Sequence, residues 1–327
     1  MPEVRHWIIA YAAPPDGTDT HIPPLPALQR WLARAVPHAS YDGDPWSLTP
    51  PHEHALARAL GWSIEDGRLP WAAWHAGRAG VACAWLWPCA WQAGLDHITL
   101  IPPQALDLRP DEAVALKAAF SPYAAEDGIA LDDDGSPGRW LAEGDLFDGW
   151  TGASLDRVAH RRADVWWRDA GSQPSARTLL RLLNEAQMLF HDHPVNAARV
   201  ARGALPINGL WISGAGRWRG DGPRPAEASV QLIDALVEPA TRGDALGWAA
   251  GWQALEPELA NWMAAADADG QPRWLTLCGE RGWRTWRLDP GADPAPRPRR
   301  GWRDWWQRLR GRPATPAAAV LDWWSGL

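Results

Sequence analysis

The stretch that decides the fold runs from residue 177 to residue 216 and reads RTLLRLLNEAQMLFH (177–191), D, HPVNAARVAR (193–202), GALPINGLWISGAG (203–216). Apolar residues at helical spacing, among them Leu179, Leu183 and Phe190, predict an amphipathic helix in its first part. The second part predicts a short helix, and the third predicts a strand at 207–213 that opens into a glycine turn. This succession of helix and strand is typical of an α/β protein.

The flanking sequence shows further helix and strand patterns. Strands are expected at 4–12, 81–87, 97–101, 128–131, 138–142, 273–278 and 283–288. Helices are expected at 25–36, 52–60, 111–123, 226–237 and 245–263, with Thr49 as the N-cap of the second. We therefore predict an α/β core in two parts (1–68 and 176–289), an inserted α+β domain (69–175) and a tail (290–327) rich in proline, arginine and tryptophan.

Composition narrows the class of protein. The chain has 327 residues, of which 46% are hydrophobic and 22% charged, as in ordinary globular proteins and unlike disordered or fibrous ones. Its three cysteines (Cys83, Cys89, Cys278) cannot form a closed disulfide framework, which favours a reducing compartment. The longest nearly apolar stretch, 81–91, is too short to cross a bilayer as a helix. We expect a cytoplasmic protein.

Charge is distributed unevenly. The net charge is −7, but residues 297–312 hold seven arginines against one aspartate. An acidic body disfavours nucleic acid as the main partner, because phosphate binding needs a broad basic face. The tail, where Trp302, Trp305 and Trp306 alternate with arginines, is interpreted first as a composition-driven extension, then as a contact for an anionic membrane surface or a protein, and last as a stacking surface for single-stranded nucleic acid.

Tryptophan is unusually frequent. There are 26 tryptophans against 3 phenylalanines and 3 tyrosines, and Lys117 is the single lysine. Such a bias is typical of a genome rich in G and C, which favours tryptophan and arginine codons. We expect most of these indoles to lie in the core or to be half-exposed.

Polar residues concentrate in the stretch quoted first. They are His191, Asp192, His193, Asn196, Arg199, Asn208, Gly214 and Gly216. Imidazoles at a helix end, an amide and a guanidinium one turn apart, and a glycine turn form a set that suits an anion or phosphate pocket. The alternative is an exposed helix junction whose histidines and asparagines cap helix ends.

The same stretch carries a family resemblance. The run HPVN at 193–196, with Arg199, Gly203, Pro206, Asn208, Trp211, Gly214 and Gly216 after it, resembles a segment of the archaeal-type cofactor-independent phosphoglycerate mutases of the alkaline phosphatase superfamily. It also resembles the bacterial RpfE-type regulatory proteins. That second resemblance extends to SLTPPHEHALARALG (47–61), ASLDR (153–157) and NEAQM (184–188). It implies an alkaline-phosphatase-like core sheet flanked by helices.

A true mutase of this superfamily uses two metal ions and a serine or threonine nucleophile, and the sequence departs from that pattern. The first strand ends in Ala12-Ala13 where an Asp-Gly metal site is expected, and no histidine follows His193. We therefore expect a degenerate, non-catalytic relative without a cofactor, a regulatory protein or one that binds a phosphorylated or other anionic small molecule. The residues expected to bind it are His193, Asn196, Arg199, Asn208, Gly214 and Gly216.

Two other interpretations stay open. The first is a metal-dependent phosphoglycerate mutase or phosphohydrolase, with Ser47 as nucleophile and manganese or zinc held by Asp16, His191 and His193. The second is a scaffold that binds a regulatory protein partner. The scaffold predicts that Arg199→Ala leaves partner affinity unchanged.

Overall fold

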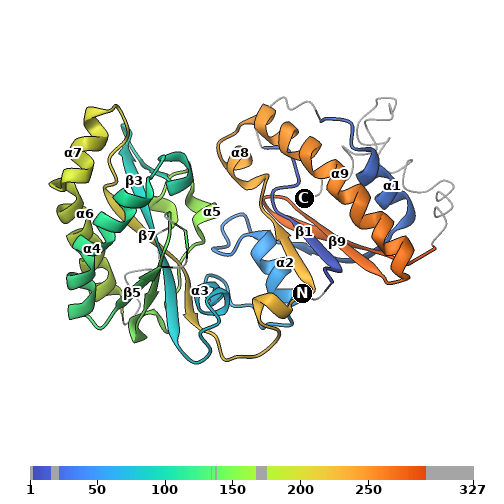
Figure 1. Ribbon diagram of the computed structural model, residues 1–327, viewed down its shortest axis with the longest axis horizontal. Helices are drawn as coiled ribbons and strands as arrows, with labels where there is room; N and C mark the ends of the chain where they lie inside the picture. The colour runs from blue at the N-terminus through green and yellow to red at the C-terminus, as the bar shows by residue number, and fades with distance from the viewer. Residues whose placement is uncertain (1–2, 16–21, 134, 137, 167–174, 292–327) are drawn as a thin grey trace. The chain divides into compact units, whose positions relative to one another are not determined.

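The computed structural model describes residues 3–15, 22–133, 135–136, 138–166 and 175–291 (Figure 1). The described chain divides into two compact units. Unit 1 comprises residues 46–228, and unit 2 comprises residues 3–45 and 229–291. The expected α/β class is confirmed, because the central sheets are accompanied by helices.

Unit 2 is built on a five-stranded sheet in the order β2-β10-β9-β1-β8. Its strands are β1 (His6–Ile9), β2 (Val36–Asp42), β8 (Val230–Ile233), β9 (Arg273–Cys278) and β10 (Gly282–Leu288). Its helices are α1 (Pro26–Arg34), α8 (Val237–Thr241) and α9 (Ala245–Asp269). β1 lies parallel to both β8 and β9, whereas β10 is antiparallel to its two neighbours.

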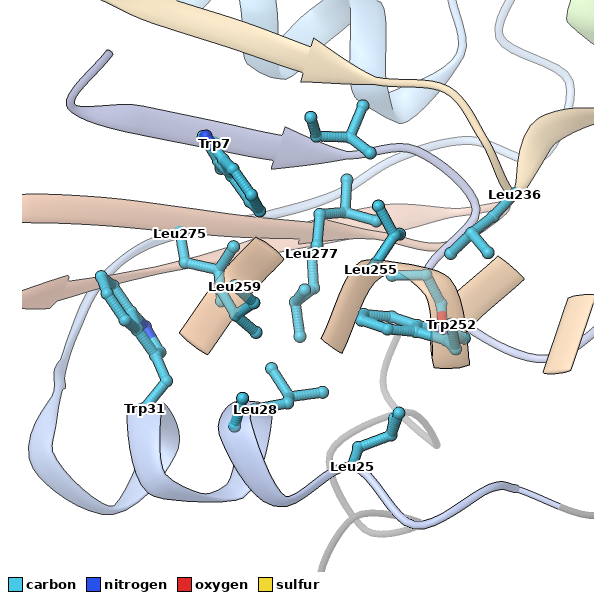
Figure 2. Close-up of a cluster of buried hydrophobic side chains, with 14 of the residues drawn as sticks. Trp7, Leu25, Leu28, Trp31, Leu236, Trp252, Leu255, Leu259, Leu275 and Leu277 are labelled. Carbon is cyan, nitrogen blue, oxygen red and sulfur yellow. The ribbon is translucent and has the colours of Figure 1, made fainter. Parts of the chain in front are cut away.

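The core of unit 2 joins one sheet face to α1 and α9. Figure 2 shows Leu28 and Trp31 of α1 and Leu255 of α9 in one cluster with Leu275 and Leu277 of β9. All five side chains are buried. Hydrophobic burial of this kind supplies most of the driving force for folding.

Tryptophans of α9 also form hydrogen bonds to the backbone on either side of β1. The indole N–H groups of Trp248, Trp252 and Trp262 donate to the backbone carbonyls of Tyr11, Ala12 and Val4, respectively. The Trp262 ring stacks against two further indoles, Trp7 at 4.9 Å and Trp31 at 5.0 Å between ring centroids. These side chains are therefore structural, as expected for most of the tryptophans.

Unit 1 is built on an antiparallel sheet in the order β4-β3-β6-β5, with β7 also paired to β3. Its strands are β3 (Ala82–Ala93), β4 (Ile98–Ile101), β5 (Ala130–Asp133), β6 (Trp140–Glu143) and β7 (Gly209–Arg217). Its helices are α2 (Pro51–Ala59), α3 (Trp71–His75), α4 (Pro110–Glu126), α5 (Leu155–Val158), α6 (Ala176–His191) and α7 (Pro194–Ala201). Short 3-10 helices lie at Pro103–Ala105 (η1), Asp145–Phe147 (η2), Asp164–Trp166 (η3) and Pro225–Glu227 (η5). Side chains of α4, α6 and the sheet share one buried cluster.

Two expected elements are wrong. The helix expected at 226–237 is instead η5 followed by β8, which pairs in parallel with β1, because the short run VQLI completes the sheet edge. The glycine turn after residue 213 is absent, since β7 continues through Gly214 and Gly216 to Arg217. Both glycines have positive φ (61° and 141°), and the β3–β7 register shifts beside them.

Some elements were not predicted at all. β2 contains Pro37 and lies at the sheet edge, where it pairs with one neighbour and proline is tolerated. The N-cap of α2 is Pro50 and not the expected Thr49, whose hydroxyl accepts from the backbone N–H of Gly67 instead.

The division of the chain also differs from the expected one. α6, α7 and β7, expected in the core, belong to unit 1, because β7 pairs with β3 along most of its length. The tail tryptophans Trp302, Trp305 and Trp306 lie outside the described residues. None of the helices within the described residues combines the length and apolar character needed to cross a bilayer.

Candidate functional site

Helix α6 separates a buried face from an exposed polar one. Leu179, Leu183 and Phe190 are buried, as their helical spacing predicts. The side chains at the intervening positions face outward, namely Asn184, Gln187, Met188 and His191. Of these, Met188 is 67% exposed.

An open cavity of about 1070 Å³ lies beside this face of α6, entirely within unit 1. It is lined by Trp91, Ile98, Ala163, Asp164, Leu180, Leu183, Asn184, Gln187, Met188, His191, Asp192, Asn208 and Leu210. Apolar side chains form most of the lining, and amides, one imidazole and two carboxylates complete it. A largely apolar pocket with a few polar groups is the usual form of a small-molecule site.

Asn208 and Gly209 hold Trp91 in the cavity wall. The Asn208 side chain accepts from the backbone N–H of Trp91 at 2.6 Å and donates to its carbonyl at 3.1 Å. A Cβ on Gly209 would lie 1.9 Å from the indole nitrogen of Trp91, so only glycine leaves room for the ring. Asn208 was predicted to bind a ligand, which stays a prediction; the structure shows that its amide holds the backbone of Trp91.

The cavity's charge is negative. Among the described residues that line it, two are aspartates and none is lysine or arginine. Asp164 pairs with Arg162 at 2.8 Å on the surface, whereas Asp192 forms no ion pair with a described residue. Asp192 is also the C-cap of α6, where the helix dipole adds negative potential.

The HPVN segment lies in α7 and its N-terminus, and its polar atoms contact the protein. The His193 ring accepts from the backbone N–H of Val195 at 3.2 Å, which makes it the N-cap of α7. The buried amide of Asn196 donates to the carbonyls of Phe190 (2.7 Å) and Ile207 (2.6 Å) and accepts from the N–H of Ile207 (2.8 Å). Asn196 thereby ties α6, α7 and the chain before β7 together.

Arg199 is fully buried, at 0% exposure. Its guanidinium donates to Glu112 at 2.5 Å, to the carbonyl of Leu205 at 2.8 Å and to that of Leu106. Arg202 binds the same Glu112 carboxylate. Burial raises the pKa of Glu112, but hydrogen bonds from Arg202, the Arg109 backbone and Arg199 outweigh it and lower the pKa to about 2.

These contacts give Asn196 and Arg199 a structural task. Each makes several hydrogen bonds to atoms of the protein and lies away from solvent. An anion-binding role for the pair stays a prediction that this geometry does not favour.

Gly214 and Gly216 pack closely against neighbouring side chains. A Cβ on Gly214 would lie 2.8 Å from the Trp85 ring and 3.2 Å from Cβ of Trp71. A Cβ on Gly216 would lie 3.3 Å from Pro70. The two glycines let the loop before α3 and the helix itself approach β7.

Of the residues expected for metal-dependent catalysis, the structure describes Ser47, His191 and His193. Ser47 donates to the Asp66 carboxylate at 2.6 Å and to the carbonyl of Thr49 at 3.0 Å, so its hydroxyl organises the loop before α2. Asp16 lies outside the described residues. In the part of the chain that the structure describes, no three His, Cys, Asp or Glu side chains are grouped to hold a metal ion. Metal binding by His191 and His193 therefore stays a prediction.

A second polar cluster connects two segments that carry the family resemblance and lie far apart in the sequence, 47–61 and 153–157. The half-buried carboxylate of Glu53 accepts from the indole of Trp71 at 2.8 Å and the hydroxyl of Ser154 at 2.7 Å. Next to it, His52 pairs with Asp156 at 3.1 Å. Burial raises the pKa of Glu53. Sequence reasoning missed this cluster, because its halves lie about 100 residues apart in the chain.

Comparisons with known proteins give structural likeness alone. No family model and no curated protein matches the chain. A cofactor-independent phosphoglycerate mutase from Thermoplasma acidophilum superposes with a TM-score of 0.36 and 16% identity, over 89% of this chain and 91% of that one. The PH0037 protein from Pyrococcus horikoshii superposes with a TM-score of 0.47 and 10% identity, over 90% of each chain. Structural neighbours thus include a protein of the expected class, at similarities too low to carry a function over.

Proposed function

We propose that this protein binds a small molecule in the α6 cavity and acts as a regulatory relative of the phosphoglycerate-mutase-like proteins, without phosphoryl transfer. The observation that carries the proposal is the cavity itself, at about 1070 Å³, with a mainly apolar lining. Its volume is near the upper end of the range for small-molecule sites, roughly 300 to 1,000 Å³.

The lining supports binding in two further ways. Asn184, Gln187 and His191 are exposed, and no hydrogen bond joins their side chains to a described residue, so they are available to a ligand. The aromatic wall is held in advance by Asn208 and Gly209, so binding does not have to order it.

The hydroxyl of Ser47 belongs to a loop cap, and the Ser47→Ala variant tests whether it also acts in catalysis. A phosphorylated serine intermediate needs a hydroxyl activated by a base or a metal. The Ser47 hydroxyl donates to a carboxylate that also accepts from the backbone N–H groups of Leu48 and Thr49, which makes it part of a loop cap.

The test is a calorimetric titration with 1-naphthalenemethanol, a neutral aromatic probe. We expect saturable binding at one site, weakened about tenfold or more by Gln187→Trp, which places an indole in the cavity. Val114→Trp is the matched control, because Val114 is exposed on α4 and does not line the cavity.

Two results would overturn the proposal. One is the absence of saturable binding, or equal binding by wild type and Gln187→Trp. The other is conversion of 3-phosphoglycerate in the presence of manganese that Ser47→Ala abolishes, which would establish catalysis.

A further inference from the structure

We infer that the ligand of the α6 cavity is an organic cation with an apolar, aromatic-sized body. This inference rests on the proposed function and specifies the chemistry of the same site. It departs from the sequence-based expectation of a phosphorylated or other anionic ligand.

The charges around the cavity favour a cation. Asp192 and Asp164 contribute carboxylates to the lining, and no described lining residue is lysine or arginine. Arg181, a basic residue of α6, forms ion pairs with Asp127 at 2.6 Å and with Glu185 at 2.7 Å. An anion entering here would meet the carboxylate of Asp192 and no lysine or arginine of the described lining, while the carboxylate of Asp164 is already paired with Arg162.

The end of α6 adds to this preference. The helix is 16 residues long and ends at His191, beside the cavity, so its C-terminal carbonyls contribute partial negative charge there. Asp192 follows immediately and has no cationic partner among the described residues. A ligand ammonium would supply the missing positive charge.

The apolar lining indicates the chemistry of the part of the ligand that carries no charge. Trp91 presents an aromatic ring, and aromatic rings attract cations as well as apolar groups. Ile98 and Met188 both line the cavity and are 46% and 67% exposed, so a ligand body would cover apolar surface that is now open. A primary amine attached to an aromatic or bulky aliphatic body matches both halves of the site.

The experiment compares three probes of similar size and shape at pH 8. They are 1-naphthylmethylammonium, 1-naphthalenemethanol and 1-naphthoate, each titrated calorimetrically into the whole protein. We expect the ammonium probe to bind about tenfold more tightly than the alcohol, and the carboxylate to bind most weakly.

Two variants test whether Asp192 causes the preference for the ammonium probe. Asp192→Asn keeps the shape of the side chain and is expected to weaken the ammonium probe about three- to fivefold while leaving the alcohol unchanged. Glu126→Gln changes the net charge by the same amount on the exposed surface of α4, away from the cavity lining, and is expected to change neither affinity.

The outcomes separate the two proposals. If the alcohol binds but the ammonium binds no better, or if the carboxylate binds best, the cation inference fails and the proposed function stands. If no probe binds, both fail. If Glu126→Gln has the same effect as Asp192→Asn, the preference comes from overall charge and the inference is overturned.

Discussion

The α7 region and the α6 cavity are neighbours in sequence and differ in what their polar groups do. In the α7 region, Asn196 and Arg199 are buried and hydrogen-bonded to the protein. At the cavity, Asn184, Gln187 and Asp192 have exposed side chains with no hydrogen-bond partner among the described residues. A polar side chain that has met its hydrogen-bonding needs inside the protein stabilises the fold, whereas one left at a cavity is available to a ligand.

This contrast changes the interpretation of the motif. HPVN and the arginine after it form the junction between α6, α7 and α4, and through that junction they fix the position of α6. The ligand site that we propose lies on the other, exposed face of α6. The predictions below test whether the two regions can be separated by mutation.

The largest expected effect is that of Arg199→Ala on stability. Removing the guanidinium takes one of three donors from the Glu112 carboxylate and leaves the carbonyls of Leu106 and Leu205 without their Arg199 donor, which should lower the free energy of unfolding by about 3 to 5 kcal/mol. Urea denaturation measures this loss. Arg202→Ala, whose side chain is partly exposed, should cost less. A stable Arg199→Ala protein that has lost probe binding would reverse the assignment of the two regions.

Next comes Asn208→Ala, which links the two regions. It removes two hydrogen bonds to the Trp91 backbone, so we expect a loss of about 1 to 3 kcal/mol of stability and about tenfold weaker probe binding. Asn184→Ala is the control, because it removes an exposed amide without such bonds and should leave stability nearly unchanged. An Asn208→Ala protein with wild-type affinity would show that Trp91 needs no positioning.

The pH dependence of stability should report the Glu112 cluster. The pKa of Glu112 is lowered to about 2 in the folded protein, so its contribution is present above the unfolded-state value and is lost as the pH falls toward 2. We expect Glu112→Gln to be less stable than wild type at pH 6. The difference should shrink between about pH 4.5 and pH 2, as followed by urea denaturation. A difference independent of pH would contradict the ion-pair assignment.

The smallest effect is expected at Glu53. Burial raises the pKa of this carboxyl, so its ionised form costs stability as the pH rises through the folded-state value. Glu53→Gln keeps an acceptor for Trp71 and Ser154 and removes the charge. We expect stability at pH 8 to be unchanged or raised by up to about 1 kcal/mol, and the gain over wild type to diminish at lower pH. A large loss at pH 8 would show that the charge itself is needed.

Elements with strong local patterns were predictable from the sequence. The helices at Ala176–His191 and Ala245–Asp269 and the strand Arg273–Cys278 follow from periodicity and β-branched or aromatic content. β8 and β2 were missed, because each becomes a strand through pairing with a distant partner and carries little local signal. The unit boundary at 46 and 228 depends on the β3–β7 pairing, which is equally non-local.

The candidate site was predictable only in part. His191 and Asn208 were named as candidates for metal or ligand binding, and both line the cavity. The ion pair of Arg199 could not be predicted from residue spacing, because only the fold places Glu112 next to it. Trp91 and Asp164 lie more than 50 residues apart in the sequence. No local motif therefore predicts that they line one cavity.

Methionine methyl resonances test the central claim, that a ligand occupies the α6 cavity, most directly. The chain has three methionines. Met188 lines the cavity, whereas Met263 lies buried in the core of unit 2, and Met188→Leu assigns the first signal. On titration of 1-naphthylmethylammonium into protein labelled with ¹³C at the methionine methyls, the account predicts a saturable shift of the Met188 signal and an unmoved Met263 signal. An unmoved Met188 signal, or equal shifts of both, would contradict it.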